Sequence, residues 1–170
     1  LLQAALRTVV GEHVAQSGSA VEADRFRFDF SHFKATAPEE LAAVERRVNE
    51  QIAAQLPVTA RETSLNEAKA AGAMALFGEK YGQTVRLVEM GTASKELCGG
   101  THVAQTGDIG VCKLLSESSV GSNLRRIEAL TGPAALAHLN EREAILKQVA
   151  GDLGTQPERV PQVIDKLQAD

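Results

Sequence analysis

Tryptophan is absent from this chain of 170 residues, and Phe, Tyr and Trp together make up only 4% of it. Many RNA-binding modules stack bases on exposed aromatic side chains, so this composition argues against an aromatic base-stacking platform. The net charge of −4 argues against a broad surface that coats nucleic acid. A local basic cleft is still compatible with it, because binding depends on where Lys and Arg lie.

Cysteine is scarce as well, with Cys98 and Cys112 as its two occurrences. Disulfide bonds are typical of secreted proteins, so two cysteines without a secretory pattern indicate a reducing, cytoplasmic location. Glycines and a histidine follow Cys98, which favours a metal ligand there, whereas the apolar run around Cys112 is typical of a small buried residue. No apolar run approaches the ~20 residues that cross a bilayer, so we expect no membrane partner.

What the chain does contain are hydrophobic patterns that predict an α+β fold. Phenylalanines alternate with charged residues over 25–30, which predicts a half-buried strand. Helical patterns cover 1–10 and 38–56. A capping-box spacing at Ser64 predicts a helix that runs through the alanine-rich residues, where Gly72 and Gly78 interrupt or end shorter helical pieces. Further strands are expected over 14–21, 58–63, 84–90, 109–118 and 124–129, which gives an antiparallel sheet with packed helices.

The best domain boundary is Thr131-Gly132-Pro133. Beyond it, apolar residues at helical spacing predict a first helix, residues 154–157 interrupt the pattern, and a second helix follows. We therefore expect an α+β domain over 1–132 and a helical hairpin over 133–170. The chain begins with Leu, and its first residues already follow a helical pattern, which predicts a piece of a longer protein.

The most informative motif is Cys98-Gly99-Gly100-Thr101-His102. It places a sulfur ligand and an imidazole four positions apart, around glycines that allow a tight bend, so both side chains can point at one tetrahedral zinc ion. The backbone N–H groups of the glycines could also orient a substrate carbonyl or stabilise an oxyanion. The alternative is a glycine turn between a buried thiol and a surface imidazole, and two ligands alone do not hold zinc.

Other polar residues allow more than one interpretation. Arg125 and Arg126 are adjacent on a predicted strand, so their side chains face opposite ways. One of them can pair with Glu128 or another acid, while the other reaches solvent or a phosphate. A solvated edge strand with an ion pair is the alternative. Gln16 lies in a turn-rich segment where a solvated side chain is common, and His32 is either a strand-end cap or a polar site residue.

Together these motifs resemble the editing domain of bacterial-type alanyl-tRNA synthetase, and the resemblance covers nearly the whole chain. The segments that carry it are residues 1–7, 13–18, 27–32, 98–102, 107–110 and 125–128. The resemblance implies the antiparallel fold of that editing domain and a hydrolase that releases serine or glycine wrongly attached to tRNA(Ala). It also implies an ATP-dependent alanine–tRNA ligase as the parent protein, in which residues from 133 lead toward the C-terminal region.

The resemblance further implies a set of site residues. Zinc would be held by Cys98, His102 and a His-x-x-x-His pair that should end immediately before Leu1, so half of the ligands are expected outside this chain. Gln16 matches a position of the amino-acid pocket. The catalytic residues would be Cys98, Gln16, Gly99 and Gly100, and the contacts to the tRNA acceptor end would come from Arg125 and Arg126.

Two alternatives remain beside the hydrolase. Because half of the zinc site is missing, the chain could be a non-catalytic tRNA-binding or assembly module. A structural metal knuckle would need a partner from His13, His32 or His138. Any contacts between subunits are expected beyond Asp170.

Overall fold

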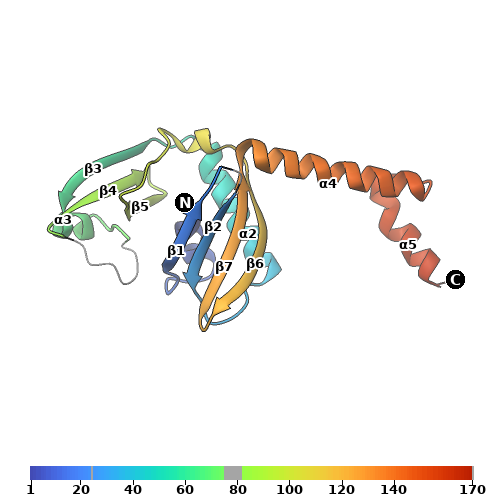
Figure 1. Cartoon of the computed structure of the whole chain (residues 1–170), viewed down its shortest axis with the longest axis horizontal. Helices are drawn as coiled ribbons and strands as arrows, with labels where there is room; N and C mark the ends of the chain where they lie inside the picture. Colours follow the sequence, from blue (N-terminus) through green and yellow to red (C-terminus); the bar gives the residue numbers. More distant parts are fainter. Residues whose placement is uncertain (24, 75–81, 170) are drawn as a thin grey trace. The chain divides into compact units, whose positions relative to one another are not determined.

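Two antiparallel sheets and the helices packed on them make up residues 1–132 in a computed structural model of the chain (Figure 1). The structure describes residues 1–23, 25–74 and 82–169. Leu1–Gly132 form one compact unit and Pro133–Asp170 form a second. The α+β fold class with antiparallel sheets is therefore confirmed.

The larger sheet has the strand order β1-β2-β7-β6, and every neighbouring pair is antiparallel. Its strands are β1 (Gln16–Val21), β2 (Phe26–Ser31), β6 (Cys112–Gly121) and β7 (Leu124–Thr131). The register places Phe28 opposite Ile127 and Asp29 opposite Arg126, so one face of the sheet is apolar and the other is polar. Phe28 and Phe30 are buried, which confirms the half-buried strand expected from the alternating residues.

Two helices cover the apolar face of this sheet, namely α1 (Leu2–Val9) and α2 (Pro38–Ala53). Pro38 suits the first position of a helix because its φ is fixed, and Glu40 accepts the N–H of Ala37 as a cap. The core cluster joins both helices to the sheet. Its buried members are Leu2, Ala5, Leu6, Val14, Phe28, Phe30, Val44, Val48, Ile52, Cys112, Ile127 and Ala129.

The smaller sheet has the order β3-β4-β5. It is formed by β3 (Val58–Ser64), β4 (Thr84–Met90) and β5 (Ser94–Leu97). The helix α3 (Leu65–Ala70) begins at the predicted capping box, in which the Glu67 N–H donates to the Ser64 hydroxyl at 3.2 Å. The apolar cluster under this sheet consists of Ala68, Val85, Leu87 and Leu97.

Some predicted boundaries differ from the structure. The helix α3 ends at Ala70 and does not run through the alanine-rich residues, because Gly72 has a φ of 80° that the helix cannot continue through. The predicted pieces around Leu76, Phe77 and Gly78 lie outside the described residues.

Two further differences involve strands. β5 has no counterpart among the predicted strands, since a four-residue strand with alternating Ser, Lys, Glu and Leu shows little hydrophobic pattern. The strand expected from Ile109 begins instead at Cys112. The 3₁₀ helix η1 (Thr106–Ile109) occupies the preceding residues, and Gly110 follows it with a φ of 70°.

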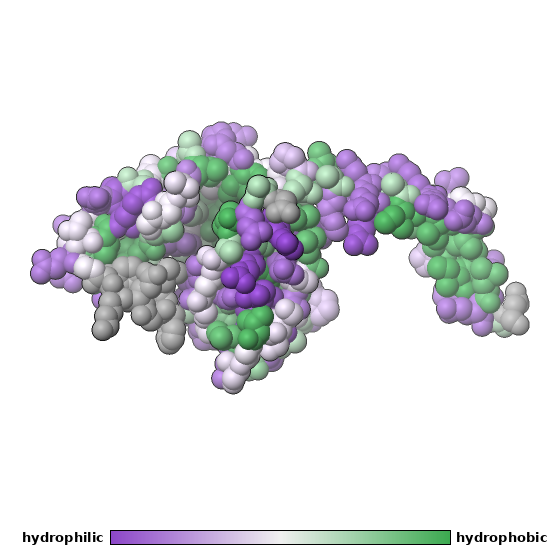
Figure 2. All heavy atoms as spheres, viewed as in Figure 1, coloured by the Kyte–Doolittle hydropathy of each residue, from purple (hydrophilic) through white to green (hydrophobic). Residues whose placement is uncertain are grey.

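The second unit contains α4 (Gly132–Asp152), the 3₁₀ turn η2 (Pro157–Arg159) and α5 (Val160–Ala169). Gly154, at a φ of 61°, lies in the turn after α4, and the Thr155 N–H donates back to the Ala150 carbonyl at 2.9 Å. Two consecutive helices joined by a turn are therefore present, as expected. Large apolar side chains are exposed along both helices (Figure 2): Leu136, Leu139, Ile145, Leu146, Val149, Ile164 and Leu167. Among the helices of the described residues, none has both the length and the apolarity to cross a membrane.

Candidate functional site

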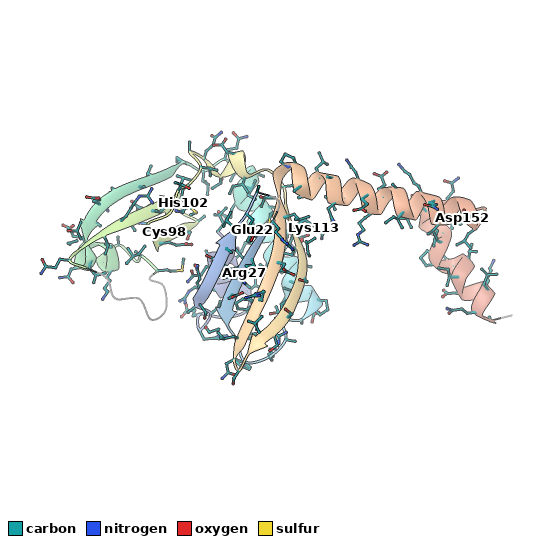
Figure 3. All side chains as sticks on the ribbon, in the orientation of Figure 1. Glu22, Arg27, Cys98, His102, Lys113 and Asp152 are labelled. Carbon is teal, nitrogen blue, oxygen red and sulfur yellow. The ribbon has the colours of Figure 1, made fainter. Side chains whose placement is uncertain are left out.

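The 98–102 loop leaves the smaller sheet at the end of β5 (Figure 3). Leu97 is buried, and the Cys98 N–H still donates to the Arg86 carbonyl at 3.1 Å, which extends the pairing with β4 by one residue. The Cys98 side chain is half-buried, whereas the residues from Gly99 to His102 are exposed. A buried leucine thus anchors one end of the loop, and the glycines after it have no side chain to bury.

Arg86 of β4 fixes the shape of this loop. Its Nη1 donates to the carbonyl oxygens of Cys98, at 3.0 Å, and of Gly100. Such charge-assisted bonds are stronger than neutral ones, and two of them hold carbonyls that are two residues apart. The Gly100 N–H in turn donates to Sγ of Cys98 at 3.4 Å. No sequence signal identifies Arg86, because its role depends on the register that places Leu87 opposite Leu97.

The chain bends at Gly100, and the two glycines of the loop reach this bend without a left-handed backbone. Neither has a positive φ, unlike Gly91 in the turn between β4 and β5. A Cβ at Gly99 would meet nothing within 4 Å, and one at Gly100 would lie 3.5 Å from Sγ of Cys98. The glycines therefore leave the sulfur and the neighbouring backbone open to a ligand. The Gly100 N–H is already used by the sulfur, whereas the Gly99 N–H has no acceptor within the described part of the chain.

His102 ends the motif, largely exposed but close to several charges. Desolvation of the ring lowers the pKa of His102 below 6.5, and the positive charges of Arg86 and of the Leu1 amino group act in the same direction, whereas Glu96 raises it. The imidazole is therefore neutral at pH 7, which is the form that binds a metal. The Leu1 nitrogen lies 3.7 Å from the Glu96 carboxylate, so the start of α1 lies against β5.

Cys98 and His102 are the two zinc-type donors of the loop, and Figure 3 labels both. Thiolate sulfur and neutral imidazole nitrogen are ligands that zinc prefers, so the donor types fit. Within residues 1–23, 25–74 and 82–169, no three His, Cys, Asp or Glu side chains are grouped so that they could hold a metal. His13 and His32, considered as further partners, bond to each other instead, with Nε2 and Nδ1 2.8 Å apart. The loop therefore offers half of a tetrahedral donor set.

Gln16 lies on the other sheet. It is the first residue of β1, opposite Phe30 and next to a register shift that ends at Gly18. Its Nε2 donates to Oγ of Ser19 at 2.9 Å. Among the hydrogen bonds of the described residues, none joins Gln16 to the 98–102 loop. The structure brings Cys98, Gly99, Gly100 and His102 together in one loop, and a pocket role for Gln16 stays a prediction.

Arg125 and Arg126 of β7 both make bidentate ion pairs, one on each face of the larger sheet. Arg125 donates to Glu117 of β6 at 2.6 and 2.7 Å, and its side chain and that of Glu117 are 15% and 5% exposed. Arg126 donates to Asp29 of β2 at 2.7 and 2.8 Å, and these hydrogen bonds lower the pKa of Asp29. The adjacent arginines face opposite ways, as expected, and each pairs with an acid other than Glu128, so neither is left to reach solvent or a phosphate alone. Contact between these arginines and tRNA stays a prediction, and it would have to compete with a carboxylate in each case.

The 98–102 loop lies within a segment that matches a known family model. Residues 85–128 match the family model described as "Threonyl and Alanyl tRNA synthetase second additional domain". That match begins in β4, includes the 98–102 loop and ends in β7.

Similarity to larger proteins extends over nearly the whole chain. The chain is 53% identical over 168 residues to an alanine–tRNA ligase of Idiomarina loihiensis, which covers 99% of this chain and 19% of that relative. An alanine–tRNA ligase of Acetivibrio thermocellus is 51% identical over 173 residues, covering 99% of the chain and 20% of the relative. One of Pelotomaculum thermopropionicum is 56% identical over 150 residues, covering 88% and 17%.

The chain spans about a fifth of the length of the curated relatives it matches. The family resemblance based on the motifs is therefore confirmed. The chain is similar over nearly its whole length to alanine–tRNA ligases, and its residues 85–128 match the second additional domain of the threonyl and alanyl tRNA synthetases.

Proposed function

We propose that residues 1–132 form an editing domain that hydrolyses wrongly charged tRNA(Ala) and releases serine or glycine. The observation that carries this proposal is the 98–102 loop, held open by Arg86 within the segment that matches the synthetase domain. The relatives' name, alanine–tRNA ligase, supplies tRNA(Ala) as the partner and protein synthesis as the context. Residues 133–170 then lead toward the C-terminal region of such a ligase.

The chemistry of alanine selection explains why such a domain is needed. A cavity that accepts alanine also accepts glycine, and a pocket without a specific polar contact rejects the additional hydroxyl of serine only weakly. Binding alone therefore leaves some tRNA(Ala) carrying the wrong amino acid. A second, hydrolytic site removes these products.

Hydrolysis of an aminoacyl ester needs an oriented water more than a strong nucleophile, because the ester is already activated. Zinc, when bound by Cys98, His102 and further ligands, supplies a Lewis acid for that water or for the amine or hydroxyl of the substrate. The Gly99 N–H can donate to the substrate carbonyl, since it has no acceptor within the described residues. Arg86 is a positioning residue that acts through the loop backbone. Gln16 is proposed to contact the serine hydroxyl.

The position of α1 supports an upstream source of the remaining zinc ligands. The Leu1 nitrogen lies against Glu96, two residues before Cys98 along the chain. A His-x-x-x-His pair ending just before Leu1 would add about one helical turn to α1 at this place. The extended chain is therefore the form in which zinc binding and hydrolysis are expected.

The test compares deacylation of Ser-tRNA(Ala) by this chain and by a form extended with the upstream residues of an alanine–tRNA ligase. We expect zinc and activity in the extended form, and Cys98→Ala should reduce both, with deacylation falling at least about 100-fold. Cys112→Ala is the matched control, because burial raises the pKa of the Cys112 thiol to about 11 and keeps it protonated. Deacylation unchanged by Cys98→Ala would remove Cys98 from the mechanism.

A second candidate function is a non-catalytic tRNA-binding or assembly module. It is favoured because, within the described residues, no three His, Cys, Asp or Glu side chains are grouped so that they could hold a metal. This alternative predicts that the extended form binds tRNA(Ala) but neither binds zinc nor hydrolyses Ser-tRNA(Ala).

A further inference from the structure

Two histidines and a phenylalanine form an aromatic cluster where β2 leaves the larger sheet. The ring centroid of His13 lies 5.0 Å from that of His32 and 5.6 Å from that of Phe33, and the centroids of His32 and Phe33 are 4.7 Å apart. Phe33 is 70% exposed, and His13 is also exposed. We call these three residues the aromatic platform.

His32 gives this platform a fixed base. It is only 3% exposed, and its ring stacks on the buried Phe30 at 6.4 Å with an interplanar angle of 20°. Its backbone N–H donates to the Asn123 carbonyl at 3.0 Å, in the turn between β6 and β7. The imidazole of His32 also bonds to His13. The two exposed rings are therefore held by a buried neighbour, which lowers the entropy lost when a flat ligand stacks on them.

We propose that the aromatic platform stacks on an unpaired nucleobase of the RNA partner, with tRNA as that partner only if the proposed function holds. Stacking on aromatic rings suits any base, because every base has a π-face, and Phe and His are both used in this way. The low content of Phe, Tyr and Trp understates this capacity, because it leaves out the imidazole rings.

The charges around the platform suit a nucleotide. Lys34 directly follows Phe33, is exposed, and takes part in no ion pair among the described residues. Two acids lie close enough to act on the charge of His32, and both already have partners. Glu117 is paired with Arg125, and Glu40 caps α2. Glu12 is an exposed carboxylate next to His13 in sequence. Lys34 could therefore contact the phosphate of a nucleotide while the exposed rings of His13 and Phe33 stack on its base.

The size of the platform favours a nucleotide over a protein partner. One exposed phenylalanine and one imidazole offer far less than the roughly 800 Å² per partner of a stable protein interface. The exposed residues next to the platform in sequence, Glu12 and Lys34, are polar, and so are the exposed Ser122 and Asn123 of the turn to which His32 is bonded. Bases within a duplex have both faces covered, so the ligand must be an unpaired nucleotide.

The absence of Trp from the chain allows a direct test with a single reporter. Phe33→Trp keeps an aromatic face, and we expect its emission to be quenched by a single-stranded hexa-adenylate RNA. Phe33→Leu keeps an apolar side chain but loses the π-face, and should weaken binding of the same RNA, measured by anisotropy, roughly tenfold. Val21→Leu, at an 83% exposed position opposite Phe26 on β1, is the matched control and should bind like the wild type.

The outcomes separate this inference from the proposed function. Equal affinity of Phe33→Leu and the wild type for hexa-adenylate, or unquenched indole emission from the Phe33→Trp variant on addition of that RNA, would overturn the inference whatever the hydrolysis assay shows. Weaker self-association of Phe33→Leu with unchanged RNA affinity would assign the platform to a protein contact and would also overturn it. Quenching and weaker binding without any Ser-tRNA(Ala) hydrolysis by the extended form would uphold the platform while the editing proposal fails.

Discussion

The larger and the smaller sheet of residues 1–132 differ in the size of the apolar clusters that pack against them. Among the residues that the structure describes, the core cluster of the larger sheet has twelve buried members and includes residues of two helices, whereas that of the smaller sheet has four. The zinc-type motif lies on the smaller sheet, directly after its short edge strand β5. Functional loops are commonly carried by a scaffold whose stability lies elsewhere.

This difference has a physical basis in the loop itself. Residues 99–102 are exposed, and the loop is held mainly by hydrogen bonds to Arg86 and by the sulfur of Cys98. The proposed editing site would have to admit the end of a tRNA and a further zinc ligand, and such a site cannot be closed by packing. The larger sheet is therefore expected to determine global stability, and the smaller sheet to determine chemistry.

The strongest test of this comparison is a pair of truncations, one under each sheet. Phe30→Ala removes a fully buried ring from the larger core and should lower the free energy of unfolding by about 4 kcal/mol. Leu87→Ala, also fully buried, should cost about 2 kcal/mol, because the small cluster around it can collapse more easily. Urea unfolding followed by circular dichroism measures both.

Hydrogen exchange gives the regional readout for this pair. Leu87→Ala should speed exchange in β3, β4 and β5 while β2 and β7 stay protected, whereas Phe30→Ala should speed exchange everywhere. Val21→Ala, at an 83% exposed position, should change the free energy of unfolding by less than about 0.5 kcal/mol. Uniform exchange in Leu87→Ala would show that the two sheets unfold as one, and the comparison would fail.

The two bidentate pairs of β7 sharpen the comparison within the larger sheet. Glu117→Ala removes the partner of Arg125, whose side chain is nearly buried. It should lower the free energy of unfolding by about 3 kcal/mol. Asp29→Ala breaks the more exposed pair with Arg126, whose side chains are 18% and 27% exposed, and should cost about 1 kcal/mol. The free energies of unfolding of these variants, of Arg125→Met and Arg126→Met, and of the two corresponding double variants form double-mutant cycles. A larger coupling energy for the exposed pair would contradict the ranking by burial.

The sequence predicted the features that are local along the chain. The alternation of residues 25–30, the start of α2 at Pro38 and the capping box at Ser64 each depend on neighbours within a few positions, and each is present. The zinc-type motif was recognisable for the same reason, since both of its donors lie within five consecutive residues.

Features that depend on strand pairing were not predictable. Arg86 reaches the 98–102 loop through the register of β4 with β5, and the Arg125–Glu117 pair requires the register of β6 with β7. The contact of His13 with His32 joins residues 19 apart. The separate uses of the two glycines were not distinguishable either, because an open approach to the sulfur and a tight turn leave the same sequence signal.

The smallest expected effect concerns acidification, which should distinguish His32 in the larger core from His102 in the exposed loop. Burial lowers the pKa of His32 below 6.5; His13 and Lys34 act in the same direction, and Glu40 and Glu117 oppose them. As the pH falls through 6.5, the unfolded chain binds more protons at this position than the folded chain does. The stability is therefore complete above pH 6.5 and falls below it. The pKa of His102 is also lowered, but solvent screens this exposed ring, so its contribution is smaller.

The measurement is the urea midpoint between about pH 7.5 and pH 5.5, a range above the ordinary pKa values of Asp and Glu, where pairs such as Asp29–Arg126 do not yet titrate. His32→Phe keeps the stacking on Phe30 but has no titratable group, so its midpoint should depend less on pH than that of the wild type. His102→Gln should follow the wild-type curve. If His102→Gln flattens the curve and His32→Phe does not, the exposed loop of the smaller sheet carries the pH dependence. Its protonation would then be coupled to global unfolding, and chemistry and stability would not be divided between the two sheets.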